Sequence, residues 1–345
     1  MRIGLVVQPL ERTPPIRYGA VERIVAYLAD TLVERGHDVT LFASGDSQTR
    51  ARLVPCTERA LLHDPGHAGE SWWVNNTQMA QVVAAQDEFD VINSHAGYAF
   101  LPATLALRTP VVTTWHGRMH LPVTHRMLEH YRHTAFISIA RHQVEAAGPG
   151  VRWAGHVPNG IPGDAVTYRE HKRDFLLFLG RITPAKRPDV AIRAARRGGL
   201  PIRLAGRVAP ADQDYFRTVV QPLLGSEAEY LGEITDAEKL DLLADARGLM
   251  HPSDWEACSV SLIEAHAAGT PCLALDRGGN AEIVRHEVTG FVGDGEEDLV
   301  RGCRSLDRIA PASCRARYEE EFSADRMTDR ALAALESEVL AGVRR

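Results

Sequence analysis

Two cations five residues apart mark the first segment that could do chemistry. Arg181 and Lys186 fall on one predicted loop, which follows an apolar strand ending in Gly180 and precedes a helix predicted from Pro188. An arginine binds an oxyanion through its planar fork of N–H groups, whereas a lysine acts as a point charge, so together they would suit a diphosphate. The alternative is a pair of solvated surface cations, which is the usual environment of these residue types.

Two glutamates, Glu256 and Glu264, form the second candidate. A strand predicted to end at His251 runs into a loop that carries Glu256, and a helix then opens with small residues. If the whole segment were helical, the eight-residue spacing would leave the two carboxylates ~80° apart around the helix, so we predict Glu256 on the loop and Glu264 about two turns along the helix. A buried Glu264 needs hydrogen-bond donors, which ligand hydroxyls would supply. The alternative is a surface glutamate on an amphipathic helix.

Helix starts and a lone histidine add further candidates. Gly19 begins a helix after the first strand, and the small residues after Glu256 begin another, so both starts could present backbone N–H groups to an anion. A glycine near a helix start is, however, common for structural reasons alone. His116 directly follows a predicted strand over 111–115. A single histidine at such a place is more often structural.

A stretch rich in histidine raises the question of a metal site. Within eighteen residues the chain carries His116, His120, His125, His130 and His133. The segment has no H-E-x-x-H motif, and Leu121-Pro122 interrupts it. We therefore expect no metal, and a structural zinc site is the alternative.

The elements that must position these residues alternate along the chain. Strands are predicted at 2–8, 38–43, 90–94, 111–115 and 135–139, and the apolar residues of 21–33 recur at helical spacing. Such alternation predicts a parallel sheet covered on both faces, with chemistry at the carboxyl ends of the strands.

A second alternation follows turn-rich segments at 148–150 and 158–163, which predict a crossing between domains. Its predicted strands are 175–180, 201–206, 229–232, 248–251, 271–276 and 289–292. The predicted fold class is therefore α/β with two Rossmann-like domains, 1–160 and 161–322. An apolar stripe over 323–345, including Met327 and Leu335, predicts a final helix that packs back on the first domain.

Two common nucleotide motifs are absent from the sequence. No G-x-G-x-x-G follows the first strand, and no G-x-x-x-x-G-K-[ST] occurs anywhere. These absences disfavour dehydrogenase and ATP chemistry and favour another ligand held between the domains.

Taken together, the segments resemble the retaining GT-B glycosyltransferases of family 4. The resemblance rests on Tyr18-Gly19, on Arg181 with Lys186, on the glutamate pair and the Glu-Ala-His-Ala-Ala-Gly-Thr-Pro that follows, and on residues 278–284 and 289–292. It implies two Rossmann-like domains facing across a cleft, a nucleoside-diphosphate sugar as donor, an acceptor hydroxyl and no metal cofactor.

The resemblance also implies roles for the matching residues. Arg181 and Lys186 would grip the donor diphosphate, while Glu264 would bind the ribose hydroxyls. Glu256 and His116 would contact the donor sugar, so the expected catalytic set is His116, Arg181, Lys186 and Glu256. The expected donor-binding set is Gly19, Arg181, Lys186, Ala257, Cys258, Ser259, Val260 and Glu264.

Nucleobase contacts in such proteins are often made by the backbone, and we expect them near Arg207, Glu233 and Ile234. The chain also departs from the family pattern. It has Gly19-Ala20 where Gly-Gly is frequent, and Glu256-Ala257-Cys258-Ser259 where Glu-Gly-Phe-Gly is frequent; Ala281 replaces a usual proline. The resemblance implies a turn that faces the sugar, and because this chain has larger residues there, the identity of the donor sugar stays open. Without the proline, the loop at Ala281 is expected to be less rigid.

Composition sets the class and the compartment. A net charge of −6 over 345 residues gives no electrostatic footprint of a nucleic-acid binder, so positive charge for an anion must be local. The basic residues are nearly all arginines, and the lysines are Lys172, Lys186 and Lys239. Five scattered cysteines predict a reducing, cytoplasmic setting, and no apolar run is long enough to span a membrane.

The predicted function is transfer of a hexose-type sugar from a nucleoside diphosphate to a small-molecule acceptor such as a natural product. UDP is the first expectation for the nucleoside diphosphate, and GDP is the second. Two alternatives stay open: a nucleotide-sugar epimerase, and a non-catalytic sugar-nucleotide-binding module. The oligomeric state is not predicted.

Overall fold

The computed structural model describes residues 1–17, 19–63 and 71–343. The chain divides into two compact units, Met1–Gly160 with Ala324–Arg345, and Ile161–Ser323. The sequence-based boundaries are 160/161 and 322/323, so the second lies one residue later in the structure.

The first unit is built on a parallel sheet of seven strands in the order β3-β2-β1-β4-β5-β6-β7. Its strands are β1 Arg2–Val6, β2 Asp38–Ala43, β3 Arg52–Pro55, β4 Val91–Ser94, β5 Val111–Trp115, β6 Ala135–Ser138 and β7 Arg152–His156. Its helices are α1 Ala20–Glu34, α2 Ser71–Ala85, α3 Pro122–His130, α4 Arg141–Ala147 and α12 Ala324–Val343.

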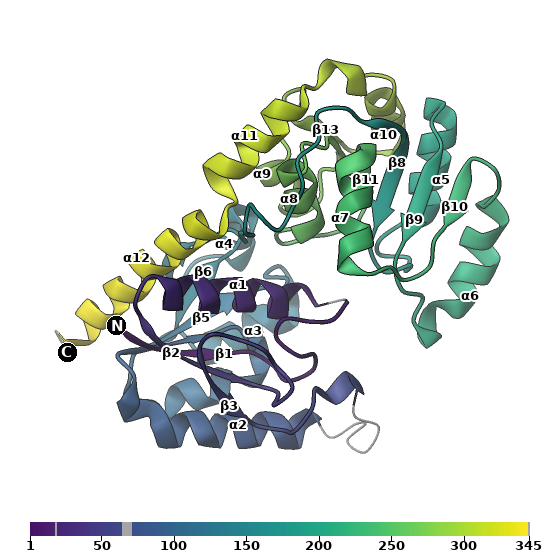
Figure 1. Cartoon of the computed structure of the whole chain (residues 1–345). Coiled ribbons are helices and arrows are strands. Elements are labelled where there is room, and N and C mark those ends of the chain that lie inside the picture. The colour runs from purple at the N-terminus through teal and green to yellow at the C-terminus, as the bar shows by residue number, and fades with distance from the viewer. Residues whose placement is uncertain (18, 64–70, 344–345) are drawn as a thin grey trace. The chain divides into compact units, whose positions relative to one another are not determined.

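Helices cover both faces of this sheet because each carries an apolar side. α1 buries Ile24, Leu28 and Leu32, which recur at helical spacing, and it contacts α12. α2 lies on the opposite face, where Val82 joins a core with residues of β2 and β4 (Figure 1).

The last helix, α12, belongs to the first unit and is tied to it by ion pairs. Arg35, at the end of α1, bonds Asp325 at 2.8 Å and Asp329 at 2.6 Å. Arg152 of β7 donates to both carboxylate oxygens of Glu338 at 2.6 and 2.7 Å.

The second unit is built on a parallel sheet of six strands in the order β10-β9-β8-β11-β12-β13. Its strands are β8 Arg173–Leu179, β9 Ile202–Ala205, β10 Ala228–Tyr230, β11 Ala246–His251, β12 Cys272–Leu275 and β13 Gly290–Gly293. Its helices are α5 Pro188–Gly198, α6 Gln213–Tyr215, α7 Asp236–Asp245, α8 Val260–Ala267, α9 Asn280–Ile283, α10 Glu296–Cys303 and α11 Pro311–Glu321.

Two strands were not predicted from the sequence, β3 and β7. The second of these corrects the predicted crossing, because β7 occupies the interval between the turn-rich segments at 148–150 and 158–163. The crossing itself is therefore confined to the residues that follow His156.

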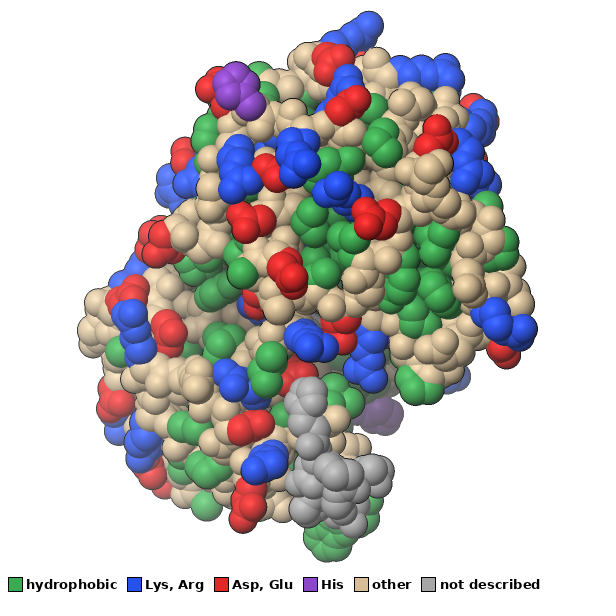
Figure 2. All heavy atoms as spheres, turned by 45° about the vertical axis from the view of Figure 1, so that its right-hand side comes forward, with side chains coloured by type: hydrophobic (Ala, Val, Ile, Leu, Met, Phe, Trp, Pro, Cys, Tyr) green, Lys and Arg blue, Asp and Glu red, His purple; other side chains and the backbone are tan. Residues whose placement is uncertain are grey.

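Surface charge is mixed on the face of the molecule that Figure 2 shows. Acidic and basic side chains alternate over the face shown in Figure 2, without a broad basic area. Among the described residues no helix has both the length and the apolar character needed to cross a bilayer.

Candidate active site

The strand order of each sheet reverses at one point, and several of the predicted site residues lie beside the reversal of the second sheet. The reversal lies between β1 and β4 in the first sheet and between β8 and β11 in the second. Chains leaving the carboxyl ends of two such strands diverge, which opens a crevice where ligands bind in open α/β sheets. Arg181 and Lys186 follow β8, and Glu256 follows β11, so they flank the reversal of the second sheet.

An ion pair crosses this reversal point. The Lys186 ammonium donates to Oε1 of Glu256, and both side chains are largely buried. The same two loops are joined by a backbone bond of 2.9 Å from Asp254 N to Ala185 O and by Arg187, which lies 3.2 Å from the Asp254 carboxylate. The sequence placed the two charges on loops, and the fold brings them into contact.

The Glu256 carboxylate stays ionised although it is buried. Burial alone would raise its pKa, but His251, whose Nε2 lies 3.3 Å from Oε1 without an aligned hydrogen bond, and the Lys186 ammonium together lower the pKa to about 2. A carboxylate with so low a pKa is a poor proton donor at neutral pH, but it accepts hydrogen bonds strongly.

A glycine turn fixes the backbone of Glu256. Gly278 has φ +65°, and a Cβ on it would lie 2.0 Å from the carbonyl oxygen of Glu256. Gly279 donates its N–H to that same oxygen at 2.9 Å. Only glycine fits at this position, because both the backbone conformation and the space exclude a side chain.

The second glutamate, Glu264, lies on α8 and is 5% exposed. It accepts a hydrogen bond of 2.6 Å from the Lys239 ammonium, which also lies 3.1 Å from Asp236. Lys239 stands on the first turn of α7 and was missed in the sequence analysis. The scarcity of lysine was the available signal, since the two glutamates contact two of the three lysines in the chain.

Three of the four residues expected at the start of α8 are buried: Ala257, Cys258 and Ser259. The helix proper begins at Val260, two residues later than the start expected near Cys258, with Ser259 at the N-cap position. The Ser259 hydroxyl lies 3.0 Å from the Ser261 hydroxyl. The first N–H groups of α8 therefore follow directly on the Glu256 loop.

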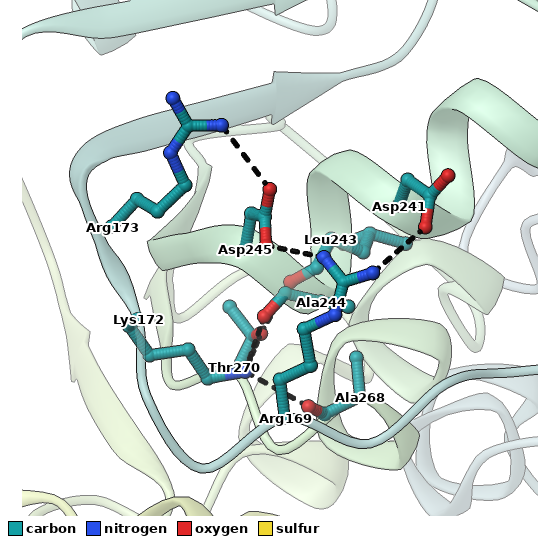
Figure 3. A network of polar contacts seen from close by, with 9 residues as sticks. All are labelled: Arg169, Lys172, Arg173, Asp241, Leu243, Ala244, Asp245, Ala268 and Thr270. Carbon is teal, nitrogen blue, oxygen red and sulfur yellow. Dashed lines mark hydrogen bonds and ion pairs between the residues drawn. The ribbon is translucent and has the colours of Figure 1, made fainter.

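The opposite end of α8 is held by a lysine. Lys172, just before β8, donates to the carbonyl oxygens of Ala244 at 2.9 Å and Ala268 at 2.8 Å, and to the Thr270 hydroxyl at 2.9 Å (Figure 3). Ala244 lies in the last turn of α7 and Ala268 caps α8, so one ammonium satisfies carbonyls at two helix C-termini. Burial lowers the Lys172 pKa to about 8.

The expected nucleobase region lies on loops that are joined to the Arg181 loop. Ile182 N donates to Arg207 O at 2.9 Å, and Gly206 N donates to Gly232 O at 2.8 Å. The loops after β8, β9 and β10 thus form one backbone-linked rim. Arg181, Arg207 and Glu233 are exposed on it, and Ile234 is half-buried.

His116 and Gly19 belong to the first unit. Gly19 is the N-cap of α1, and a Cβ on it would lie 2.8 Å from the Pro15 ring; its partner in the motif, Tyr18, lies outside the described residues. His116 follows β5, and its Nε2 lies 3.0 Å from Nδ1 of His95, a residue that the sequence analysis did not select. Burial lowers the His116 pKa to about 4.

A carboxylate near Gly19 was also missed. Glu22, on the first turn of α1, has its pKa raised to about 7 by burial and by the nearby Glu11 carboxylate. Its side chain is the third neighbour that a Cβ at position 19 would meet, at 3.1 Å. No sequence motif distinguishes it from an ordinary first-turn glutamate.

The histidine-rich stretch does not form a metal centre in the part of the chain that the structure describes, where no three His, Cys, Asp or Glu side chains are arranged to hold an ion. His125 instead bonds the carbonyl oxygen of Ala146 at 2.9 Å.

Comparison with known proteins matches each half of the chain to a glycosyltransferase family model. Residues 20–153 match the family model Glycosyltransferase Family 4, and residues 165–314 match Glycosyl transferases group 1. A D-inositol 3-phosphate glycosyltransferase of Rhodococcus erythropolis is 32% identical over 200 residues, which are 52% of this chain and 43% of that protein. The chain thus matches less than half the length of this relative.

Solved structures are similar over nearly the whole chain. AviGT4, a glycosyltransferase involved in avilamycin A biosynthesis, has a TM-score of 0.77 at 24% identity and covers 99% of this chain and 98% of its own. Anabaena Alr3699/HepE in complex with UDP and glucose has a TM-score of 0.76 at 18% identity, over 98% and 100%. At these identities the likeness shows the fold, which is GT-B.

Proposed function

The chain belongs to the family 4, group 1 glycosyltransferases. We propose that it moves a hexose-type sugar from a nucleoside diphosphate to a hydroxyl of a small-molecule acceptor, with retention of configuration. We propose UDP as the nucleoside diphosphate, and GDP as the second choice. One observation carries the proposal: the Lys186–Glu256 pair spans the strand reversal of the second sheet, with Arg181 on the same loop as Lys186. The matches to AviGT4 and to the UDP-bound HepE support the choices of acceptor class and base.

The residues of the second unit suit a leaving diphosphate. Arg181, Lys186 and the first N–H groups of α8 are preorganised donors at one sheet edge, where negative charge develops as the sugar departs. These groups supply positive charge without a metal ion, so none is part of the proposal.

Glu256 is assigned a hydrogen-bonding role rather than a nucleophilic or acid role. Its pKa of about 2 leaves it with no proton to donate at neutral pH, and it accepts hydrogen bonds from donor-sugar hydroxyls. The proton of the acceptor hydroxyl then passes to the leaving phosphate on the same face of the sugar. The C–O bond to phosphate breaks as the C–O bond to the acceptor forms, and configuration is retained.

Donor binding must compete with the ion pair already present. Lys186 is committed to Glu256, so the diphosphate has to draw the ammonium away from the carboxylate, while a sugar hydroxyl replaces it there. This exchange keeps both charges paired, which lowers the cost of breaking a largely buried ion pair.

The two glutamates provide the decisive experiment. Glu256→Gln should lower kcat about 10- to 100-fold, yet leave UDP affinity unchanged or stronger, because Lys186 loses a competing carboxylate. Glu264→Gln should instead weaken UDP roughly tenfold or more, because the ribose contact loses its charge. Calorimetry with UDP, beside initial rates, separates the two; equal effects on affinity would contradict the assignment.

Thermal shift identifies the base. UDP, GDP, dTDP and ADP are compared, and a nucleotide at 100 times its Kd should stabilise the protein by about 2.7 kcal/mol. Incubating the donor alone and then with an acceptor separates transfer from epimerisation, since an epimerase converts the donor without any acceptor.

The five cysteines are free thiols, which suits the cytoplasm that we propose as the compartment.

A further inference from the structure

A chain of three hydrogen-bonded side chains lies at the carboxyl edge of the first sheet. Asn93 is in β4, His95 directly follows β4, and His116 directly follows β5. Oδ1 of Asn93 lies 2.8 Å from His95 Nε2, and His95 Nδ1 lies 3.0 Å from His116 Nε2. All three belong to one unit and to neighbouring strands.

The outer partners of Asn93 fix the direction of this chain. Asn93 Nδ2 lies 3.0 Å from the carbonyl oxygen of Val112 and 2.9 Å from the Thr114 hydroxyl. A carbonyl only accepts, so the amide nitrogen must face it and Oδ1 must face His95. Oδ1 also only accepts, and His95 therefore carries its proton on Nε2.

Because both histidines are neutral, the direction of the first hydrogen bond also fixes the direction of the bond to His116. Burial, and the neighbouring His116, lower the pKa of His95 well below its usual value, and burial lowers that of His116 to about 4. A neutral imidazole has one N–H, so His95 Nδ1 must accept and His116 Nε2 must donate. His116 is left with a lone pair on Nδ1, and within the described residues this atom has no hydrogen-bond partner.

The turn that carries His116 is itself fixed. Buried Gln143 donates to the carbonyl oxygens of Trp115 at 3.0 Å and Gly117 at 2.9 Å, on either side of the histidine. Its own Oε1 accepts from Ile139 N at 2.9 Å. The ring of His116 is thus held both through its backbone and through Nε2.

We infer that Asn93 and His95 are positioning residues that lock His116 in the Nε2–H tautomer, so that Nδ1 accepts a hydrogen bond from a hydroxyl of the bound sugar substrate. The inference rests on the proposed function for the identity of the ligand. A hydrogen-bond acceptor at this place favours a ligand group that donates a hydrogen bond. It disfavours fluorine or an ether oxygen of similar size, which cannot donate one.

The tautomer is measured directly by ¹⁵N NMR of histidine-labelled protein without ligand, with His116→Gln and His95→Gln spectra for assignment. We expect one Nε2–H form of His116 in the native protein. In Asn93→Asp, the carboxylate holds His95 protonated on both nitrogens, so His95 Nδ1–H donates to His116 and the tautomer of His116 reverses. A native mixture or Nδ1–H form, or an unchanged tautomer in Asn93→Asp, would overturn the inference.

Conservative replacement separates positioning from packing. Gln at position 95 can accept from His116 through Oε1 and donate to Asn93 through Nε2, whereas Leu can do neither. With UDP-glucose as probe, His95→Gln should keep kcat/KM within about threefold, and His95→Leu should lose about 10-fold or more. Equal losses in the two variants would assign His95 to packing alone.

The acceptor role is read from a panel of monodeoxyfluoro UDP-glucoses. One analogue should lose about 10- to 100-fold in kcat/KM against UDP-glucose in the native protein, and much less in His116→Phe. No selective loss would overturn the ligand part of the inference. If no UDP-hexose, UDP-glucose included, is used as donor, the proposed function fails, while the NMR result still decides the tautomer of His116.

Discussion

The carboxyl edges of the two sheets share a geometry and differ in electrostatics. Each is a parallel edge with one strand reversal. The edge of the second unit carries ionised groups, with Lys186 on Glu256 and Lys239 on Glu264. The edge of the first unit carries two neutral histidines, His95 and His116, in a hydrogen-bonded chain. The same framework thus carries an ionised edge in one unit and an uncharged, hydrogen-bonded edge in the other.

The difference arises from what accompanies burial. At the charged edge an opposite charge meets each glutamate, so the pKa of Glu256 falls to about 2 in spite of desolvation. At the neutral edge no carboxylate among the described residues bonds either histidine, so desolvation decides and both pKa values fall. Burial therefore yields an ion in one place and a neutral ring in the other.

The largest expected effect comes from removing a positive charge from the carboxyl edge of the second unit's sheet. Arg181→Ala should lower kcat by about 10²–10³, because one preorganised donor to the leaving diphosphate is lost. Arg197→Ala is the control, since this arginine lies in the last turn of α5 and pairs with Glu297 in the first turn of α10. Initial rates measure both, and an unchanged rate in Arg181→Ala would remove this residue from the site.

A smaller loss should follow from moving Glu256 without changing its charge. In Gly278→Ala the new Cβ collides with the Glu256 carbonyl, and displacement by about 1 Å costs turnover on the order of 10²-fold. Gly199→Ala has a similar φ of +79° but open space, so it reports backbone strain alone. Should both variants retain full kcat, the glycine turn does not position Glu256.

The charged edge also depends on the far end of α8. Lys172→Met removes the ammonium from carbonyls of two helix ends, of which that of Ala268 keeps, among the described residues, only Arg169 N at 3.3 Å, and should lower the free energy of unfolding by about 2–3 kcal/mol. Arg173→Met, next in the chain, loses only an exposed ion pair at 3.4 Å and should cost less than about 1 kcal/mol. Urea denaturation measures the free energy of unfolding of both variants. Similar losses would show that Lys172 does not hold the two helix ends together.

The smallest effect distinguishes the two edges by pH. Unfolded histidine binds a proton near pH 6.5 but folded His116 only near pH 4, so at this residue the unfolded state binds more protons and the contribution of His116 to stability falls as pH drops through this window. The slope is at most about 1.4 kcal/mol per pH unit for each such histidine. Glu256 loses its contribution mainly below its unfolded pKa of 4.5, so it adds little slope between pH 6.5 and 5.

Denaturation of the native protein and of His116→Gln across pH 7 to 5 checks this prediction. The variant should show the shallower dependence. Parallel curves would mean that His116 is protonated equally in the folded and unfolded states.

Sequence patterns predicted the central strands and failed at the edges of the first sheet. β5 coincides with the predicted 111–115 because a central strand is an apolar run. The missed strands, β3 and β7, are the two edge strands, and each is only partly buried. An edge strand contributes to the sheet mainly through backbone hydrogen bonds, which leave little trace in side-chain type.

Local features of the site were determined by the sequence itself. Loop and helix starts depend on nearby residues, so Glu256 on a loop, Glu264 on a helix and a helix from Pro188 could all be predicted. The partners could not, because Lys186 is 70 residues from Glu256, Lys239 is 25 from Glu264 and His95 is 21 from His116. Tertiary structure decides which of these groups meet. It also decides whether an opposite charge accompanies burial, which keeps Glu256 ionised and leaves His95 and His116 neutral.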